Sequence, residues 1–174
     1  MKILRLIIFS IIFLSLVLTI ISLFIPSDVR ISKVININTV AANIWPQLND
    51  MRNWMNWYPG MKDSATQNFI SLDSSNGRIT KTSFDKTIIA LRQQKKDELV
   101  ADIETGKRHM NMGWNIISYP QSDFITLQWH LDFHLKWYPW QKFSSLLFEK
   151  IYGHQMENGL SDLKAYIENH SSKE

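Results

Sequence analysis

The sequence predicts an α+β protein in which one N-terminal transmembrane helix precedes a single domain. Three observations predict this class. Residues 6–25 form an apolar run without a charged side chain, and residues 29–137 alternate apolar and polar side chains in short segments. After Pro139 the apolar residues recur at every third or fourth position, which is the period of a helix. We therefore expect a membrane helix, a strand-rich middle and a closing helix.

The first element is the apolar run Leu6–Ile25, whose polar side chains are all hydroxyls. Its twenty residues, at a helical rise of roughly 1.5 Å, cover about 30 Å, the thickness of a hydrocarbon core. A cleaved signal peptide has a shorter apolar core and ends in small residues, whereas this run ends with Phe24, Ile25 and Pro26. We interpret residues 1–26 as an uncleaved membrane anchor and residues 27–174 as one domain.

The charges beside the run bear on its orientation. Lys2 and Arg5 precede it, and Arg30 and Lys33 follow it, so the count of basic residues is balanced. A short N-terminal head is easily retained in the cytosol, and we expect the domain on the other side. About three residues separate the run from the first strand and reach roughly 10 Å, so the domain is expected to lie against the lipid headgroups.

Composition excludes several kinds of partner and cofactor. The 174 residues include no cysteine, which excludes disulfides and thiolate metal sites. Lys2 and Arg5 account for two of the three net positive charges, and the other basic residues are scattered, so we expect no nucleic-acid binding. The chain has no phosphate-binding glycine loop, dinucleotide fingerprint, nucleophile elbow or His-Glu-x-x-His helix. We expect no cofactor, and a binding protein is favoured over an enzyme.

The domain is expected to begin with a strand at residues 29–38, whose alternation is interrupted at Lys33 and Val34. Thr39 stands at the N-cap position of a helix that contains Pro46, and a second short helix is expected at residues 51–57. Tyr58-Pro59-Gly60 is expected to stop that second helix. A strand meander follows at residues 67–72, 78–83, 86–93, 99–104, 110–117 and 124–137, with its clearest turns at 73–77 and 119–123.

One long helix of about 27 residues is predicted after Pro139. Gly153 and Gly159 inside it each cost about 1 kcal/mol relative to alanine, so we expect a close approach to the backbone or a bend there. The apolar face of this helix is formed by Phe143, Leu147, Ile151, Met156, Leu160, Leu163 and Ile167.

Two parts of the domain resemble the SRPBCC superfamily, also described as START-like or polyketide cyclase/dehydrase-like. Residues 34–38 and the following 44–59 carry the resemblance at one end, and residues 153–164 carry it at the other. The resemblance implies a helix-grip fold, in which an antiparallel sheet curls around the long C-terminal helix and leaves an apolar cavity. Membrane-anchored bacterial members begin in a similar way, which implies a bacterial inner membrane with the domain facing the periplasm or cell exterior.

The resemblance implies a ligand class but no reaction, since such folds serve binding, transport and catalysis. We expect the cavity to bind a hydrophobic small molecule or lipid. An enzyme acting on such a ligand, cyclase-like or hydrolase-like, and a ligand-free interaction module of the cell envelope are the alternatives, and protein partners are not predicted. Candidate cavity residues, which would equally fill a solid core, are Trp54, Trp57, Ile89, Leu91, Ile103, Met112, Trp114, Met156 and Leu160.

Catalytic residues are not predicted by any motif. Asp102, Glu104 and His109 are the positions at which a proton-transfer group would be sought, provided that they point inward. Their alternative interpretation is an outward, solvated position.

One predicted strand carries three potential metal ligands on one face. His130, Asp132 and His134 alternate with apolar residues and lie about 6 to 7 Å apart in succession by strand rise. Two imidazoles and a carboxylate suit a metal ion. The same alternation is typical of the solvated outer face of a sheet, and no fourth ligand is evident, so no metal is expected.

Aromatic residues repeat around two prolines. Trp57-Tyr58-Pro59, with Trp54 nearby, and Trp137-Tyr138-Pro139-Trp140 are the two groups. Tryptophan and tyrosine favour the membrane interface, which makes both groups candidates for a pocket rim or a membrane-contacting surface. Packing in the core and at its corners is the alternative.

Overall fold

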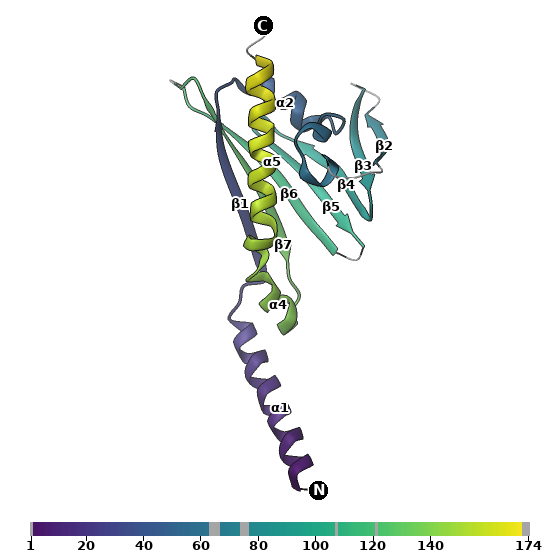
Figure 1. Ribbon diagram of the computed structural model, residues 1–174, viewed down its shortest axis with the longest axis vertical. Coiled ribbons are helices and arrows are strands. Elements are labelled where there is room, and N and C mark those ends of the chain that lie inside the picture. Colours follow the sequence, from purple (N-terminus) through teal and green to yellow (C-terminus); the bar gives the residue numbers. More distant parts are fainter. Residues whose placement is uncertain (1, 63–66, 74–76, 107, 121, 172–174) are drawn as a thin grey trace.

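The computed structural model describes residues 2–62, 67–73, 77–106, 108–120 and 122–171 (Figure 1). The tips of the two predicted turns, residues 74–76 and 121, lie outside these ranges. The helices and strands are α1 (Lys2–Leu23), β1 (Asp28–Ile37), α2 (Ala41–Asn49), the 3₁₀ helix η1 (Asn53–Asn56), α3 (Pro59–Lys62), β2 (Gln67–Asp73), β3 (Arg78–Phe84), β4 (Thr87–Gln94), β5 (Glu98–Thr105), β6 (Arg108–Ser118), β7 (Ile125–His134), α4 (Pro139–Ser145) and α5 (Phe148–Ser171).

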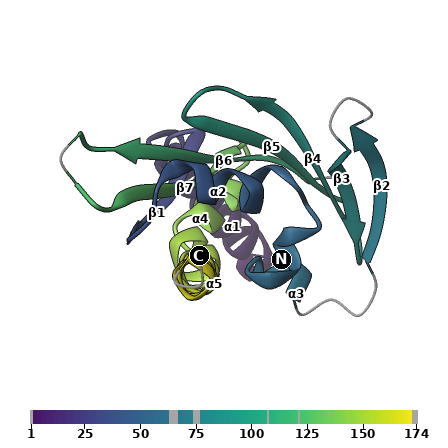
Figure 2. The ribbon, with the colours of Figure 1, turned by 90° about the horizontal axis from the view of Figure 1, so that it is seen from above.

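In the described part of the chain, seven strands form one antiparallel sheet in the order β1-β7-β6-β5-β4-β3-β2. The first strand therefore pairs with the last, and their register runs without a break from Asp28 opposite His134 to Ile37 opposite Ile125. Seen from above, the sheet curves, and α5 and α3 lie on the same side of it (Figure 2). The predicted α+β class and helix-grip architecture are confirmed.

The strand predicted at residues 29–38 is confirmed, and β1 is regular at Lys33 and Val34, where the alternation of the sequence is interrupted. Lys33 lies under α5, with its Nζ 2.6 Å from Glu149 Oε1 and 2.7 Å from Glu157 Oε1. The hydrogen bonds that Lys33 donates to these carboxylates, first to Glu149 and then to Glu157, raise the pKa of Lys33. Val34 is exposed on the opposite side.

Two details of the short helices differ from the prediction. Val40, not Thr39, occupies the N-cap of α2 and makes no capping hydrogen bond with its side chain. The Thr39 hydroxyl instead accepts a hydrogen bond from Asn43 Nδ2 at 3.1 Å. The short helix η1 ends at Asn56, before Tyr58-Pro59-Gly60 as expected, but Pro59 then begins α3, since proline lacks an N–H and has a φ angle suited to the first helical position.

The predicted closing helix is divided into α4 and α5, which are separated by Leu146 and Leu147. The division has a tertiary cause, because α5 packs against β1 whereas α4 contacts α1. The close approach predicted at the two helix glycines is confirmed. An added Cβ at Gly153 would meet the Lys33 and Glu149 side chains, and one at Gly159 would meet Pro59 and Trp129.

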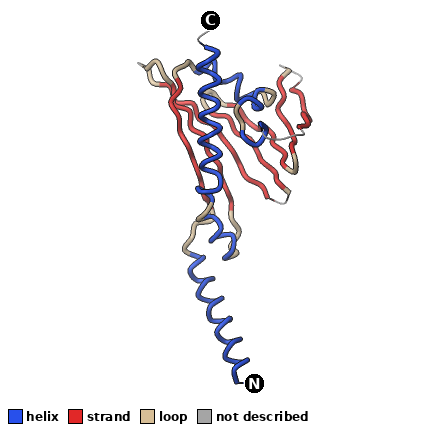
Figure 3. The backbone as a smooth tube through the Cα atoms, viewed as in Figure 1, coloured by secondary structure: helices blue, strands red, loops and turns tan. Residues whose placement is uncertain are grey.

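Helix α1 stands apart from the domain and is joined to β1 by a short loop (Figure 3). It is long and apolar enough to cross a membrane, and a membrane span and a signal sequence share these properties. Nearly all of its side chains are exposed rather than packed on the domain. The domain core is formed without it, between the sheet, α5 and the short helices.

Candidate functional site

Four tryptophans meet in the centre of the domain. Trp54 of η1 lies edge-on to Trp114 of β6, with ring centroids 5.1 Å apart, and Trp57 lies edge-on to Trp129 of β7 at 6.0 Å. The Trp54 indole N–H donates to the Leu48 carbonyl at 2.9 Å, which orients the ring from α2. All four rings are buried. They form a rigid wall between the short helices and the sheet.

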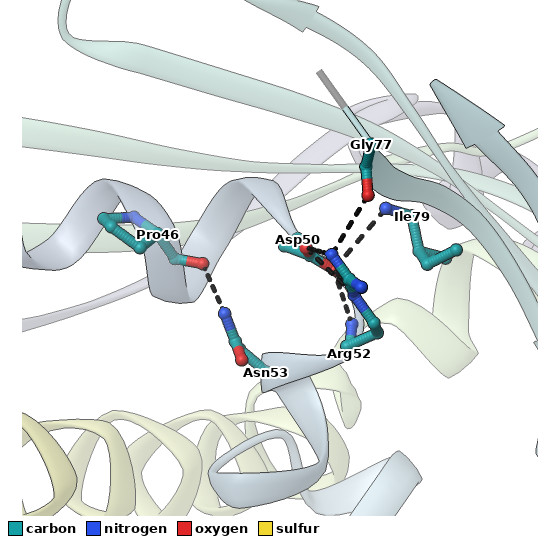
Figure 4. A network of polar contacts seen from close by, with 6 residues as sticks. All are labelled: Pro46, Asp50, Arg52, Asn53, Gly77 and Ile79. Atoms are coloured by element: carbon teal, nitrogen blue, oxygen red, sulfur yellow. Dashed lines mark hydrogen bonds and ion pairs between the residues drawn. The ribbon is translucent and has the colours of Figure 1, made fainter. Parts of the chain in front are cut away.

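A polar network holds η1 in this position (Figure 4). The Asp50 carboxylate accepts hydrogen bonds from the backbone N–H of Arg52, at 3.1 Å, and from its guanidinium. Arg52 Nη2 also donates to the Gly77 carbonyl at 3.0 Å, and Asn53 Nδ2 donates to the Pro46 carbonyl at 2.8 Å. Partial burial raises the pKa of Asp50, but the Arg52 contacts outweigh it and hold that pKa below its ordinary value. The network links α2, η1 and the start of β3.

An inner cleft of about 270 Å³ lies between the sheet, α3 and α5. Most of the side chains around it are apolar, and they come from both ends of the domain sequence. Its lining residues are Tyr58, Pro59, Gly60, Phe84, Thr87, Ile103, Thr105, Arg108, Met110, Trp129, Leu131, Tyr152, Gln155 and Met156.

An outer cleft of about 570 Å³ adjoins the inner one, since both are lined by Arg108, Met110 and Tyr152. It lies between the start of β6, the end of β7, α4 and the first turns of α5. The remaining residues around it are His109, Phe133, Leu135, Trp140, Gln141, Ser144, Leu147, Phe148 and Ile151. The two clefts together lead from Trp129 of the tryptophan wall to α4. Helix α4 lies next to the end of α1 (Figure 1).

The polar residues around the two clefts are Thr87, Thr105, Arg108, His109, Gln141, Ser144 and Gln155. Burial raises the pKa of the Tyr58 phenol well above its ordinary value, so the hydroxyl is a neutral donor at physiological pH. The buried indole N–H of Trp129 has no hydrogen-bond acceptor among the described residues. Arg108 borders both clefts.

Comparison with known proteins agrees with this geometry. The model of the family described as polyketide cyclase/dehydrase and lipid transport matches residues 28–168. The chain belongs to this family. No curated protein matches the chain.

Solved structures repeat the polyketide cyclase fold at low sequence identity. A START superfamily protein from Mycobacterium smegmatis is 17% identical, with a TM-score of 0.62 over 80% of this chain and 97% of its own. Norcoclaurine synthase from Thalictrum flavum, solved as a point mutant in complex with a transition-state analogue, is 11% identical, with a TM-score of 0.60 over 83% of this chain and 96% of its own. The two-domain aromatase/cyclase StfQ of the steffimycin biosynthetic pathway is 10% identical, with a TM-score of 0.62 over 83% of this chain and 52% of its own.

The candidate cavity residues divide between the cleft and the core of this polyketide cyclase fold. Ile103 and Met156 line the inner cleft. Leu91 is half-buried and packs against the core. The fully buried core contains Trp54, Trp57, Ile89, Met112, Trp114 and Leu160. The sequence analysis missed Arg108 and Tyr152, because they come together from separate elements and carry no common local signal.

The three candidate metal ligands lie on one face of β7, but each has another role. Arg30 binds Asp132 through two hydrogen bonds of 2.6 and 2.7 Å, and Asp28 lies 2.6 Å from His134 Nδ1. His130 is only 5% exposed, unlike the solvated position that alternation predicts. Among the described residues, no three His, Cys, Asp or Glu side chains form a group able to hold a metal ion.

The three positions considered for proton transfer lie away from the inner cleft. Asp102 forms an ion pair with Arg92, and Glu104 is exposed. His109 borders the outer cleft and has its Nδ1 3.5 Å from Glu104 Oε1.

The two aromatic groups have different environments. Trp57 is buried in the tryptophan wall, and Tyr58 and Pro59 line the inner cleft. Trp137 is 64% exposed and Trp140 is 67% exposed, at the end of the domain nearest α1. One group thus belongs to the core and cleft, and the other forms part of the surface.

Proposed function

We propose that this protein binds a hydrophobic small molecule or lipid between the sheet and α5, and that α1 anchors it in a membrane. The observation that carries the proposal is the position of the two adjoining clefts. They extend from the tryptophan wall to α4, where the domain meets the helix that is apolar enough to cross a bilayer. Membership of a family described by polyketide cyclases and lipid transport supports the same ligand class.

The lining of the inner cleft favours binding driven by apolar burial. A ligand that buries about 400 Å² of apolar surface gains around 10 kcal/mol before the costs of ordering. Arg108 and Gln155 add hydrogen-bond donors to this lining, which favour an oxygen atom on the ligand. The described residues that line the inner cleft include no carboxylate or imidazole, and this composition supports binding there more than proton-transfer catalysis.

Helix α1 and the short connection to the domain support the proposed membrane location. Only residues 24–27 lie between the end of α1 at Leu23 and the start of β1 at Asp28, so the domain has little freedom to move away from the end of α1. A bilayer around α1 would bring poorly soluble ligands close to the clefts. We propose an inner-membrane protein with residues 27–174 outside the cytosol, as the short N-terminal head favours.

The test is native mass spectrometry of the full chain, released from host membranes in a mild detergent, followed by organic extraction. The blocking variant is Thr105→Trp, which places an indole in the inner cleft. Its matched control is Glu104→Trp, one residue earlier on β5, where the side chain is exposed and does not line the cleft. We expect a stoichiometric apolar adduct in the wild type and the control, and at least a tenfold lower occupancy in the blocking variant.

Other results would contradict binding in the cleft. Equal occupancy in both variants would place the ligand elsewhere, provided that both melt within a few degrees of the wild type. A mass without any adduct, even after incubation with a host lipid extract, would favour an interaction module. Chemical conversion of the extracted ligand by the purified protein would identify an enzyme.

A further inference from the structure

Large apolar side chains gather on the surface around α4. Each of them is between 51 and 85% exposed, and five of the six lie within a stretch of fifteen residues. We call them the α4 surface: Phe24, Trp137, Trp140, Leu146, Leu147 and Ile151. Such a concentration on one end of a domain is typical of a contact with a membrane or a partner.

A buried lysine joins this surface to the end of α1. Lys142 of α4 is 5% exposed, and its Nζ donates hydrogen bonds to the Ile25 carbonyl at 2.7 Å and to the Ser27 hydroxyl at 2.8 Å. The ammonium thereby satisfies a carbonyl at the point where α1 ends, and an unsatisfied group there would be costly. If α1 crosses a bilayer, Ile25 lies at the interface, and Lys142 holds α4 at the same depth.

The composition of the surface suits the headgroup layer. Indole rings prefer the region between hydrocarbon and water, and leucine and isoleucine extend further into the acyl chains. Exposed Lys136 and Lys150 flank the apolar side chains and would attract anionic headgroups. Of the nearby acidic groups, Glu149 forms an ion pair with Lys33, and Asp28 lies beside His134.

We propose that the α4 surface docks into the headgroup layer of the membrane that α1 crosses, as a second contact in addition to that helix. The continuity of the surface with α1 through Lys142 selects the bilayer as its occupant. The inference rests on the proposed membrane location but does not need a ligand in the clefts.

The docked surface also defines an entry path. Trp140, Leu147 and Ile151 belong to the α4 surface and also line the outer cleft. When they lie in the headgroup layer, the mouth of the outer cleft opens onto lipid. A hydrophobic molecule then moves from the bilayer past Arg108 into the inner cleft without crossing water.

The immersion depth of single spin labels on the full chain tests this proposal. Because the sequence has no cysteine, Trp140→Cys and Leu147→Cys each give one labelling site. Tyr119→Cys is the matched control, since Tyr119 is an exposed aromatic residue at the opposite end of β6. In vesicles of phosphatidylethanolamine and phosphatidylglycerol, we expect labels at 140 and 147 to collide about tenfold more with oxygen than with a water-soluble nickel chelate. The label at 119 should show the reverse ratio.

Two results would overturn the docking. Equal collision ratios at positions 140, 147 and 119 would mean that the α4 surface faces water. Spectral broadening that disappears when labelled protein is diluted with unlabelled protein would mean that a second copy covers the surface. A failure of the ligand proposal is distinguishable, because protein without an adduct would still show immersed labels.

Discussion

Gly159 of α5 lies directly against Trp129 of β7, and an added Cβ would stand only 2.9 Å from the indole Cζ3. The same Cβ would stand 2.9 Å from Cδ of Pro59, the first residue of α3. Two helices and the sheet therefore meet at one glycine beside the inner cleft. The absence of a side chain lets α5 approach the sheet closely enough to bury Met156 and Leu160.

Gly159→Ala is expected to lower the free energy of unfolding by about 1–2 kcal/mol, because the overlap with two rigid rings exceeds the gain of about 1 kcal/mol in helix propensity. Gly153→Ala is the matched control in the same helix, since its Cβ would meet the flexible Lys33 and Glu149 side chains. We expect that control to be neutral or slightly stabilising. Urea unfolding in detergent micelles measures the free energy of unfolding of both variants. Equal losses of stability in the two variants would contradict the packing argument.

Gly113 has a comparable relationship with His130 on the outer side of the sheet. A Cβ at Gly113 would stand 2.5 Å from the imidazole Cε1 and 3.2 Å from the Leu99 carbonyl oxygen. Gly113→Ala should therefore destabilise the fold by about 1–3 kcal/mol. In a double-mutant cycle, His130→Ala should recover part of that loss, because the ring has gone while the carbonyl stays. Additive losses would show that the two positions do not interact.

The burial of His130 predicts a dependence of stability on pH. Burial, with a further contribution from the positive charge of Arg30, lowers the pKa of His130, although Asp132 and Glu98 oppose this. Below the ordinary value of 6.5, the unfolded chain binds a proton that the folded chain does not. This contribution to the free energy of unfolding should thus be full above pH 6.5 and decline as the pH falls through 6.5 towards the folded pKa.

His130→Gln removes the titrating group and should make the stability profile flatter between pH 7 and pH 5. The comparison is the difference in melting temperature between wild type and variant across that range. A difference that does not change with pH would contradict the assignment of this dependence to His130.

Lys142→Met should loosen α4 from the end of α1, because the Ile25 carbonyl and the Ser27 hydroxyl lose their donor. Hydrogen bonds to a charged group contribute about 1.5–3 kcal/mol, and we expect a loss of stability near that range. A spin label at position 140 should also become more mobile. Lys136→Met, at an exposed position nearby, is the control and should change the stability by less than about 0.5 kcal/mol. Unchanged mobility in Lys142→Met would show that other contacts hold α4.

The positions of the strands along the chain could be predicted because their signals are local. Alternation of apolar and polar side chains has a period of two, and it located both ends of β1 to β6 within two residues. The predicted end of the last strand was three residues too late, because β7 ends at His134 rather than Trp137. The strand-rich middle, the closing helical region and the resemblance at both ends of the domain together specified an α+β helix-grip class.

The positions that the sequence did not determine all depend on a distant partner. Lys33 faces inward because Glu149 and Glu157 lie above it, more than a hundred residues along the chain. His130 is buried because Gly113 leaves room for its ring. The alternation of apolar and polar residues along a strand shows only that Lys33 and His130 are polar. It does not show which residues pack against them.

The sequence by itself determined the class of the domain, the apolar N-terminal helix and the repeated aromatic groups, since each depends on patterns within short stretches of residues. Only the tertiary structure decided that the closing helix divides at Leu146 and Leu147 and that Trp57 is buried while Trp140 is exposed. The physical reason is the same in both cases. Lys142 joins α4 to the end of α1, whereas the helix beyond it packs on β1, and contacts between segments so far apart have no local signature.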